Sequence, residues 1–161
     1  MESIDLCNQV NLVADADKKA FGHYVEKYGL KSHAVLKLFK SNIFQGKEKF
    51  ELYVKLRGQL KLEDERRLLE THRRDLQEIY FRYCSCHEAN ERLIVRNPEI
   101  ALLYYKEHCP CAQAQKELLQ AKPKSIYLFI KEYPFCAKVR EIFLSRGDVR
   151  LVNYYMMKHP A

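Results

Sequence analysis

Two pairs of cysteines, each separated by a single residue, are the groups in this sequence best suited to bind a metal ion. Cys84 and Cys86 enclose a serine, Cys109 and Cys111 enclose a proline, and a histidine lies directly beside each pair. Thiolate and imidazole groups are ligands that zinc and iron–sulfur centres prefer. These four cysteines are therefore the candidate ligands of a metal or iron–sulfur site.

The same cysteines also fit a packing role inside a repeated structure. Cys86, Cys111 and Cys136 follow one another at intervals of 25 residues, and Cys136 has Pro134 in place of a second cysteine. Buried thiols pack as small, weakly polar groups, and structural zinc sites usually place about two to four residues between paired cysteines. We favour the packing role, and we expect neither a bound metal nor a cofactor.

A second chemical pattern is a set of cations that recurs in the short polar segments of the chain. Its members are Arg73, Arg74, Arg96, Lys122, Lys124, Arg146 and Arg150. If these segments line up along one edge of a stack, the cations form a rim that can bind phosphates or an acidic protein surface. Lys47 and Lys49 can extend this rim, whereas Asp75, Glu99 and Asp148 lie among its members and fit a solvated edge instead.

Catalytic motifs are absent from the sequence. It contains no nucleophile elbow, phosphate-binding glycine loop or HExxH pattern, so we do not expect an enzyme. The eleven tyrosines offer rings on which bases can stack, but most of them fall on apolar helical stripes. We expect most tyrosines in the core, with Tyr127 and one member of each Tyr-Tyr pair at the surface.

The elements that position these residues follow from a repeat of about 25 residues. A shift of that length carries Leu68-Leu69 onto Leu93-Ile94, then onto Leu118-Leu119 and Phe143-Leu144. A second apolar stripe, with the i, i+3, i+4, i+7 spacing of one helix face, recurs six times. Polar breaks containing proline or glycine separate the stripes. The sequence therefore predicts an all-α fold built from about six short helical hairpins.

Short helices of this kind are marginal alone, so neighbouring hairpins must stack to bury their apolar stripes. We expect a single α-solenoid domain over residues 1–161, with an irregular second unit at about 33–60. The first helix of that unit, around His33–Phe44, is expected to be longer than the others.

The segments ERLIVRNPEIALLYYKEHCPC and REIFLSRGDVRLVNYYMMKHP resemble the short units of uncharacterised bacterial tandem helical-hairpin repeat proteins. They are more loosely similar to HEAT-like and leucine-rich repeat variant proteins, whose units place a polar turn between two short helices. The resemblance implies an α-solenoid and no particular activity. Some leucine-rich repeat variant proteins carry an iron–sulfur cluster on cysteines outside the repeats, whereas the cysteines of this chain lie within them.

Composition narrows the class of protein. The 161 residues are 47% apolar and 30% charged, which is typical of one globular domain, and the net charge of +7 favours phosphates or acidic surfaces as partners. No apolar run reaches the length of a membrane span, and the first residues do not resemble a secretory signal. We therefore expect a cytoplasmic protein that does not associate with membranes and whose six cysteines are thiols.

These observations support three hypotheses of function. The leading one is a non-catalytic binding module that recognises a protein partner. The alternative is a nucleic-acid-binding repeat protein that uses the basic rim, and a second alternative is metal or iron–sulfur binding through the paired cysteines. The last apolar stripe, with Met156 and Met157 beside it, also predicts self-association through the C-terminal unit.

Overall fold

The computed structural model describes the backbone of residues 6–160 and the side chains of residues 9–160. This part of the chain forms twelve α-helices and no strand, which confirms the all-helical expectation. The helices of the first half are α1 (Leu6–Asp15), α2 (Lys18–Tyr28), α3 (Ser32–Lys37), α4 (Gly46–Arg57), α5 (Leu62–Glu70) and α6 (Arg74–Tyr83). Those of the second half are α7 (Glu88–Ile94), α8 (Pro98–Tyr105), α9 (Ala112–Leu118), α10 (Pro123–Glu132), α11 (Ala137–Arg146) and α12 (Val149–Lys158).

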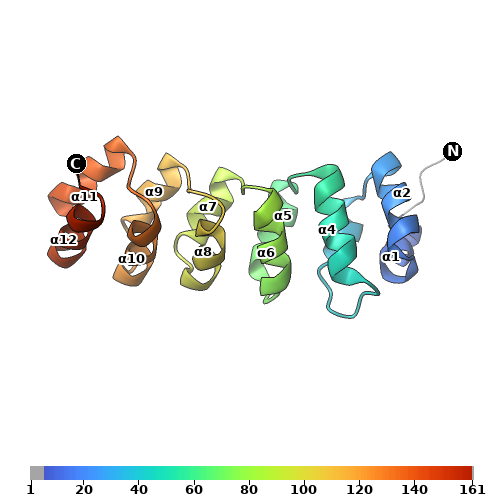
Figure 1. Cartoon of the computed structure of the whole chain (residues 1–161). Helices are drawn as coiled ribbons and strands as arrows, with labels where there is room; N and C mark the ends of the chain where they lie inside the picture. The colour runs from blue at the N-terminus through green and yellow to red at the C-terminus, as the bar shows by residue number, and fades with distance from the viewer. Residues whose placement is uncertain (1–5, 161) are drawn as a thin grey trace. The chain divides into compact units, whose positions relative to one another are not determined.

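The chain divides into two compact units, residues 1–85 and residues 86–161. In the first unit, α3 packs between α1 and α5, and α4 packs between α2 and α6. In the second unit, α9 packs between α7 and α11, and α10 packs between α8 and α12 (Figure 1). Within each unit the helices thus alternate along the chain between two packed rows. A single domain over the whole chain stays a prediction.

Local sequence explains where four of the helices begin. The Asp17 carboxylate accepts a hydrogen bond from the Ala20 amide at 2.8 Å and caps α2, and Asp148 caps α12 in the same way. Pro98 and Pro123 stand in the first turns of α8 and α10, where a missing N–H costs nothing. The polar breaks in the sequence therefore lie where helices start.

The second hairpin differs from its predicted form. The expectation of a longer first helix is wrong, because α3 ends at Lys37 and residues 38–45 form turns. Val35, Leu38, Phe39 and Ile43 are buried at helical spacing, which explains the expectation. Tertiary hydrogen bonds override that local pattern: the Phe39 carbonyl accepts from Arg73, and the Gln45 side chain accepts from the Lys18 amide.

Buried tyrosine hydroxyls hold the loops that precede α5 and α7. In the first unit, the Tyr80 hydroxyl accepts from the Leu60 amide at 3.0 Å and donates to the Glu65 carboxylate at 2.6 Å. In the second unit, the Tyr104 hydroxyl accepts from the Cys86 amide at 3.0 Å and donates to Glu91 at 2.5 Å. Because both hydroxyls are buried, these bonds fix the loops without competition from water.

A buried carboxylate or amide group completes this pattern on the odd-numbered helices. Glu91 accepts from the Cys111 amide at 2.9 Å, and Gln115 accepts from the Cys136 amide at 2.8 Å. Gln9 plays the same part in the first unit, where its Oε1 accepts from the Lys31 amide at 3.0 Å. The loops that lead into α3, α9 and α11 are therefore each tied to a preceding helix by a buried polar side chain. The loops into α5 and α7 are tied instead to a tyrosine of α6 and a tyrosine of α8, the helices that come next in the chain.

These bonds also correct the register of the repeat. Tyr80 and Tyr104 make the same bonds, although the predicted shift of 25 residues pairs Tyr80 with Tyr105. Leu93 is accordingly 48% exposed, whereas Ile94 is buried.

The predicted exposure of the tyrosines is partly right. Tyr127 is 41% exposed and Tyr155 is buried beside the half-buried Tyr154, as expected. Tyr104 and Tyr105 are both buried, so the expectation that one of them reaches the surface is wrong. Burial raises the pKa of both phenols above the ordinary value, and both therefore fold as neutral hydroxyls.

The Tyr104 network leads to a prediction about stability. Tyr104→Phe removes the acceptor of the Cys86 amide and a donor to Glu91, and we expect it to lower the free energy of unfolding by about 1–3 kcal/mol. Tyr127→Phe removes the hydroxyl of a tyrosine that is 41% exposed, and should change the free energy of unfolding by less than about 0.5 kcal/mol. Urea unfolding followed by circular dichroism measures both values. Equal effects of the two substitutions would contradict the structural role of the Tyr104 bonds.

Candidate functional site

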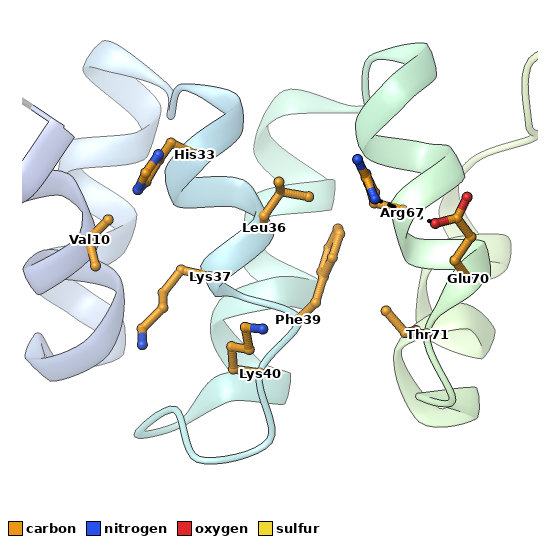
Figure 2. Close-up of a pocket in the computed structure, with 9 residues that line it drawn as sticks. All are labelled: Val10, His33, Leu36, Lys37, Phe39, Lys40, Arg67, Glu70 and Thr71. Atoms are coloured by element: carbon orange, nitrogen blue, oxygen red, sulfur yellow. Dashed lines mark ion pairs between the residues drawn. The ribbon is translucent and has the colours of Figure 1, made fainter.

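The first unit contains a groove of about 670 Å³ on the row formed by α1, α3 and α5. Residues from these three helices and from the turns after α3 and α5 line it. They are Val10, His33, Leu36, Lys37, Phe39, Lys40, Arg67, Glu70 and Thr71 (Figure 2). The volume lies within the usual range of ligand-binding cavities, which makes this groove the candidate binding site of the unit.

Short α3 places apolar and cationic side chains together in the groove. His33 and Lys37 are one helical turn apart on α3, so they share a face of that helix. In the view of Figure 2, Leu36 and Phe39 lie between Lys37 and Arg67. The site therefore combines an apolar middle with positive charge on either side.

Hydrogen bonds fix α3 and the turn after it against neighbouring elements. The Ser32 hydroxyl at the start of α3 donates to the Asp64 carboxylate of α5 at 2.9 Å. Beyond the end of α3, the Arg73 guanidinium donates to the Phe39 carbonyl at 3.1 Å. Both ends of the α3 wall are thus held, and the groove is formed before any ligand binds.

The charges of the groove are predominantly positive. Its one carboxylate, Glu70, is paired with Arg66 at 3.5 Å and with Arg67 at 3.7 Å. For Lys37 and Lys40, the described residues provide no ion-pair partner. The groove therefore presents cations whose charge is not balanced locally, which favours an anionic ligand.

The predicted basic rim is engaged in internal contacts where it belongs to the first unit. Arg73 donates to both oxygens of Asp75, at 3.1 and 3.0 Å, and this hydrogen bonding holds the pKa of Asp75 below its ordinary value. Arg74 donates to the Gln77 side chain at 2.9 Å. Lys47 pairs with Asp75, while Lys49 is buried and donates to the Val13 carbonyl at 2.8 Å.

The rim residues of the second unit are exposed. Arg96 pairs with Glu117 at 3.3 Å, and the other four exposed cations are Lys122, Lys124, Arg146 and Arg150. Arg96, Lys122 and Lys124 border a depression of about 540 Å³, and Arg146 borders another of about 450 Å³ that shares Gln120 and Ala121 with the first. The structure thus brings four of these cations together around two adjoining depressions, whereas Arg150 lines neither of them.

The paired cysteines differ in their environments. Cys84 and Cys86 are buried, Cys109 is exposed and Cys111 is half-buried. Burial raises the pKa of Cys84 and Cys111, so these thiols bind metal less readily than an ordinary cysteine.

The described part of the chain contains no group of three or more His, Cys, Asp or Glu side chains arranged to hold a metal ion. The backbone amide of Cys86 donates a hydrogen bond to the Tyr104 hydroxyl, and that of Cys111 donates to the Glu91 carboxylate. These two residues therefore have a structural role through their backbones. The side chain of Cys7 lies outside the described residues.

The groove cations were missed by the sequence reasoning, which singled out the turns between paired helices. His33, Lys37 and Lys40 follow one another at helical spacing, and this was the available signal.

Comparison of the chain with protein-family models, curated proteins and solved structures finds no match. No helix in the described part combines the length and apolar character of a membrane span.

Arg73 is predicted to support the groove wall rather than to bind a partner. Arg73→Ala removes the donor to the Phe39 carbonyl and the two bonds to Asp75, and should lower the free energy of unfolding by about 1–3 kcal/mol. Arg146→Ala, at an exposed rim position, should change it by less than about 0.5 kcal/mol. Chemical denaturation measures both, and an Arg73→Ala protein as stable as Arg146→Ala would refute the assignment.

Proposed function

We propose that this protein is a non-catalytic binding module that recognises an acidic segment of a protein partner in the groove between α1, α3 and α5. The observation that carries the proposal is the combination of Lys37 and Lys40 with the apolar pair Leu36 and Phe39 in one preformed groove. Its natural ligand is a chain that offers carboxylates on either side of an apolar residue.

Electrostatic complementarity supports an acidic ligand. The cations at the groove belong to Lys37, Lys40 and Arg67, and the single carboxylate Glu70 already pairs with arginines. Charge of one sign around an apolar surface raises the association rate with ligands of the opposite sign. It also discriminates against basic segments, which fixes the chemical class of the partner.

The apolar middle of the groove favours a peptide over a free small anion. Leu36 is half-buried, and Phe39 is 7% exposed at the groove. An apolar side chain of the ligand can remove the remaining surface from water and gain about 25 cal/mol for each Å² buried. A polypeptide supplies both the carboxylates and such a side chain.

A binding role without catalysis agrees with the groove chemistry. Its lining includes one imidazole, His33, and one carboxylate, Glu70, and the arginine partners of Glu70 lower its value as a general base.

We also propose that the chain is an α-solenoid of about six hairpins. The recurrence of the tyrosine and carboxylate bonds in both units supports this arrangement.

Binding of an acidic peptide tests the proposal. A fluorescein-labelled peptide of alternating Glu and Leu should bind the protein at low salt, more weakly near physiological salt of about 0.15 M. Lys37→Glu with Lys40→Glu should weaken binding by at least about tenfold, because like charges then face each other. Fluorescence anisotropy measures the affinities, and Lys40→Glu alone, at an exposed turn, guards against misfolding of the double variant.

Matched controls separate the groove from general basicity. Lys18→Glu with Lys19→Glu makes the same charge change on exposed positions of α2, outside the groove lining, and should bind the peptide like the parent protein. A peptide with Gln in place of Glu should not bind. Equal weakening by both double variants, or equal binding of the Gln peptide, would overturn the proposal.

A further inference from the structure

An aromatic pair lies on the surface of the second unit. The rings of Tyr127 on α10 and Tyr154 on α12 are 5.1 Å apart between centroids, with an interplanar angle of 39°. Tyr127 is 41% exposed and Tyr154 is half-buried. Most other tyrosines in the described part are buried, so this pair offers ring surface that the core does not use.

Two cations stand about one helical turn before these rings. Lys124 precedes Tyr127 by three residues on α10, and Arg150 precedes Tyr154 by four residues on α12. Residues three or four apart share a helix face, and α10 packs against α12. Both cations are exposed. Each ring thus has a cation on the same face of its helix, toward the helix N-terminus.

The positive surface continues from Lys124 along the turns. Lys124 borders the depression that Arg96 and Lys122 also line. Nearby carboxylates are largely occupied: Glu117 pairs with Arg92 and Arg96, and Asp148 accepts bonds from the Arg150 and Leu151 amides. An extended polyanion can therefore contact several cations next to the rings.

Glu132, the carboxylate whose charge acts on Tyr154, lies at the other end of α10 from Lys124. Burial, a hydrogen bond with Tyr127 and the charge of Glu132 raise the pKa of Tyr154. Glu132 is the last residue of α10, whereas Lys124 is near its first. A phosphate group is therefore favoured beside Lys124 and Arg150 and disfavoured beside Glu132.

We propose that the second unit binds single-stranded nucleic acid, with a base stacked on the Tyr127–Tyr154 pair and phosphates held by Lys124, Arg150 and Lys122. Rings flanked by cations are the arrangement with which proteins bind single strands without reading sequence. An acidic polypeptide can satisfy the cations, but it gains less from the exposed rings than a planar base does. The observations therefore favour a nucleic acid over a second acidic protein.

Fluorescence anisotropy with labelled oligouridine and oligothymidine tests this site. We expect binding that weakens steeply with salt. Tyr127→Ala should weaken it about five- to tenfold through loss of stacking, whereas Tyr127→Phe keeps the ring and should stay within about twofold of the parent. The chain contains no tryptophan, so quenching of tyrosine fluorescence gives an independent readout of stacking. Stronger binding of one oligonucleotide would distinguish RNA from DNA, and either supports the site.

Charge variants locate the phosphates. Lys124→Glu with Arg150→Glu should weaken oligonucleotide binding at least about tenfold. Lys138→Glu with Arg140→Glu makes the same charge change at exposed positions of α11 and should have a much smaller effect. Three outcomes would overturn the proposal: no binding at low salt, an unchanged affinity of Tyr127→Ala, or oligoglutamate binding as tightly as the oligonucleotides. The groove substitutions at Lys37 and Lys40 should leave oligonucleotide binding unchanged, which keeps the two proposals separable.

Discussion

The buried tyrosine hydroxyl that accepts a loop amide is the interaction on which the rest of this structure depends. A buried N–H without a partner costs about 1–3 kcal/mol, and the loops before the odd-numbered helices bring such groups into the core. Tyr80, Tyr104 and Tyr155 accept these amides, and Glu65 and Glu91 accept the tyrosine protons in turn. The directions in which α5, α7 and α11 start are thereby fixed, together with the side chains that these helices present.

Departure from this regular pattern creates the groove of the first unit. In the second hairpin, the six-residue α3 is followed by turns over residues 38–45. The other odd-numbered helices are longer or end in a shorter turn. Arg73 holds the Phe39 carbonyl, and the pair of Ser32 with Asp64 holds the other end. Irregular backbone held by side-chain hydrogen bonds often carries function, because it exposes groups that a regular helix would pack away.

Sequence reasoning predicted the helices better than the site. Apolar spacing and the prolines at positions 98 and 123 located the helices of the second half, since both reflect local physics. The one-residue shift near Tyr104 and the early end of α3 could not be predicted, because tertiary hydrogen bonds from Tyr104 and Arg73 decide them. The groove was missed for the same reason. Arg73 and Lys49 fitted a surface rim by position, but their partners Phe39 and Val13 are buried and lie more than 30 residues away in the sequence.

Hydrogen exchange of the loop amides tests most directly whether these buried side chains fix the helices. The amides of Leu60, Cys86, Cys111 and Cys136 lie outside the helices but donate to Tyr80, Tyr104, Glu91 and Gln115. Measured residue by residue by NMR, they should exchange as slowly as the helix amides of their own unit. Exchange at the rate of exposed loop amides, such as that of Ser41, would contradict the account.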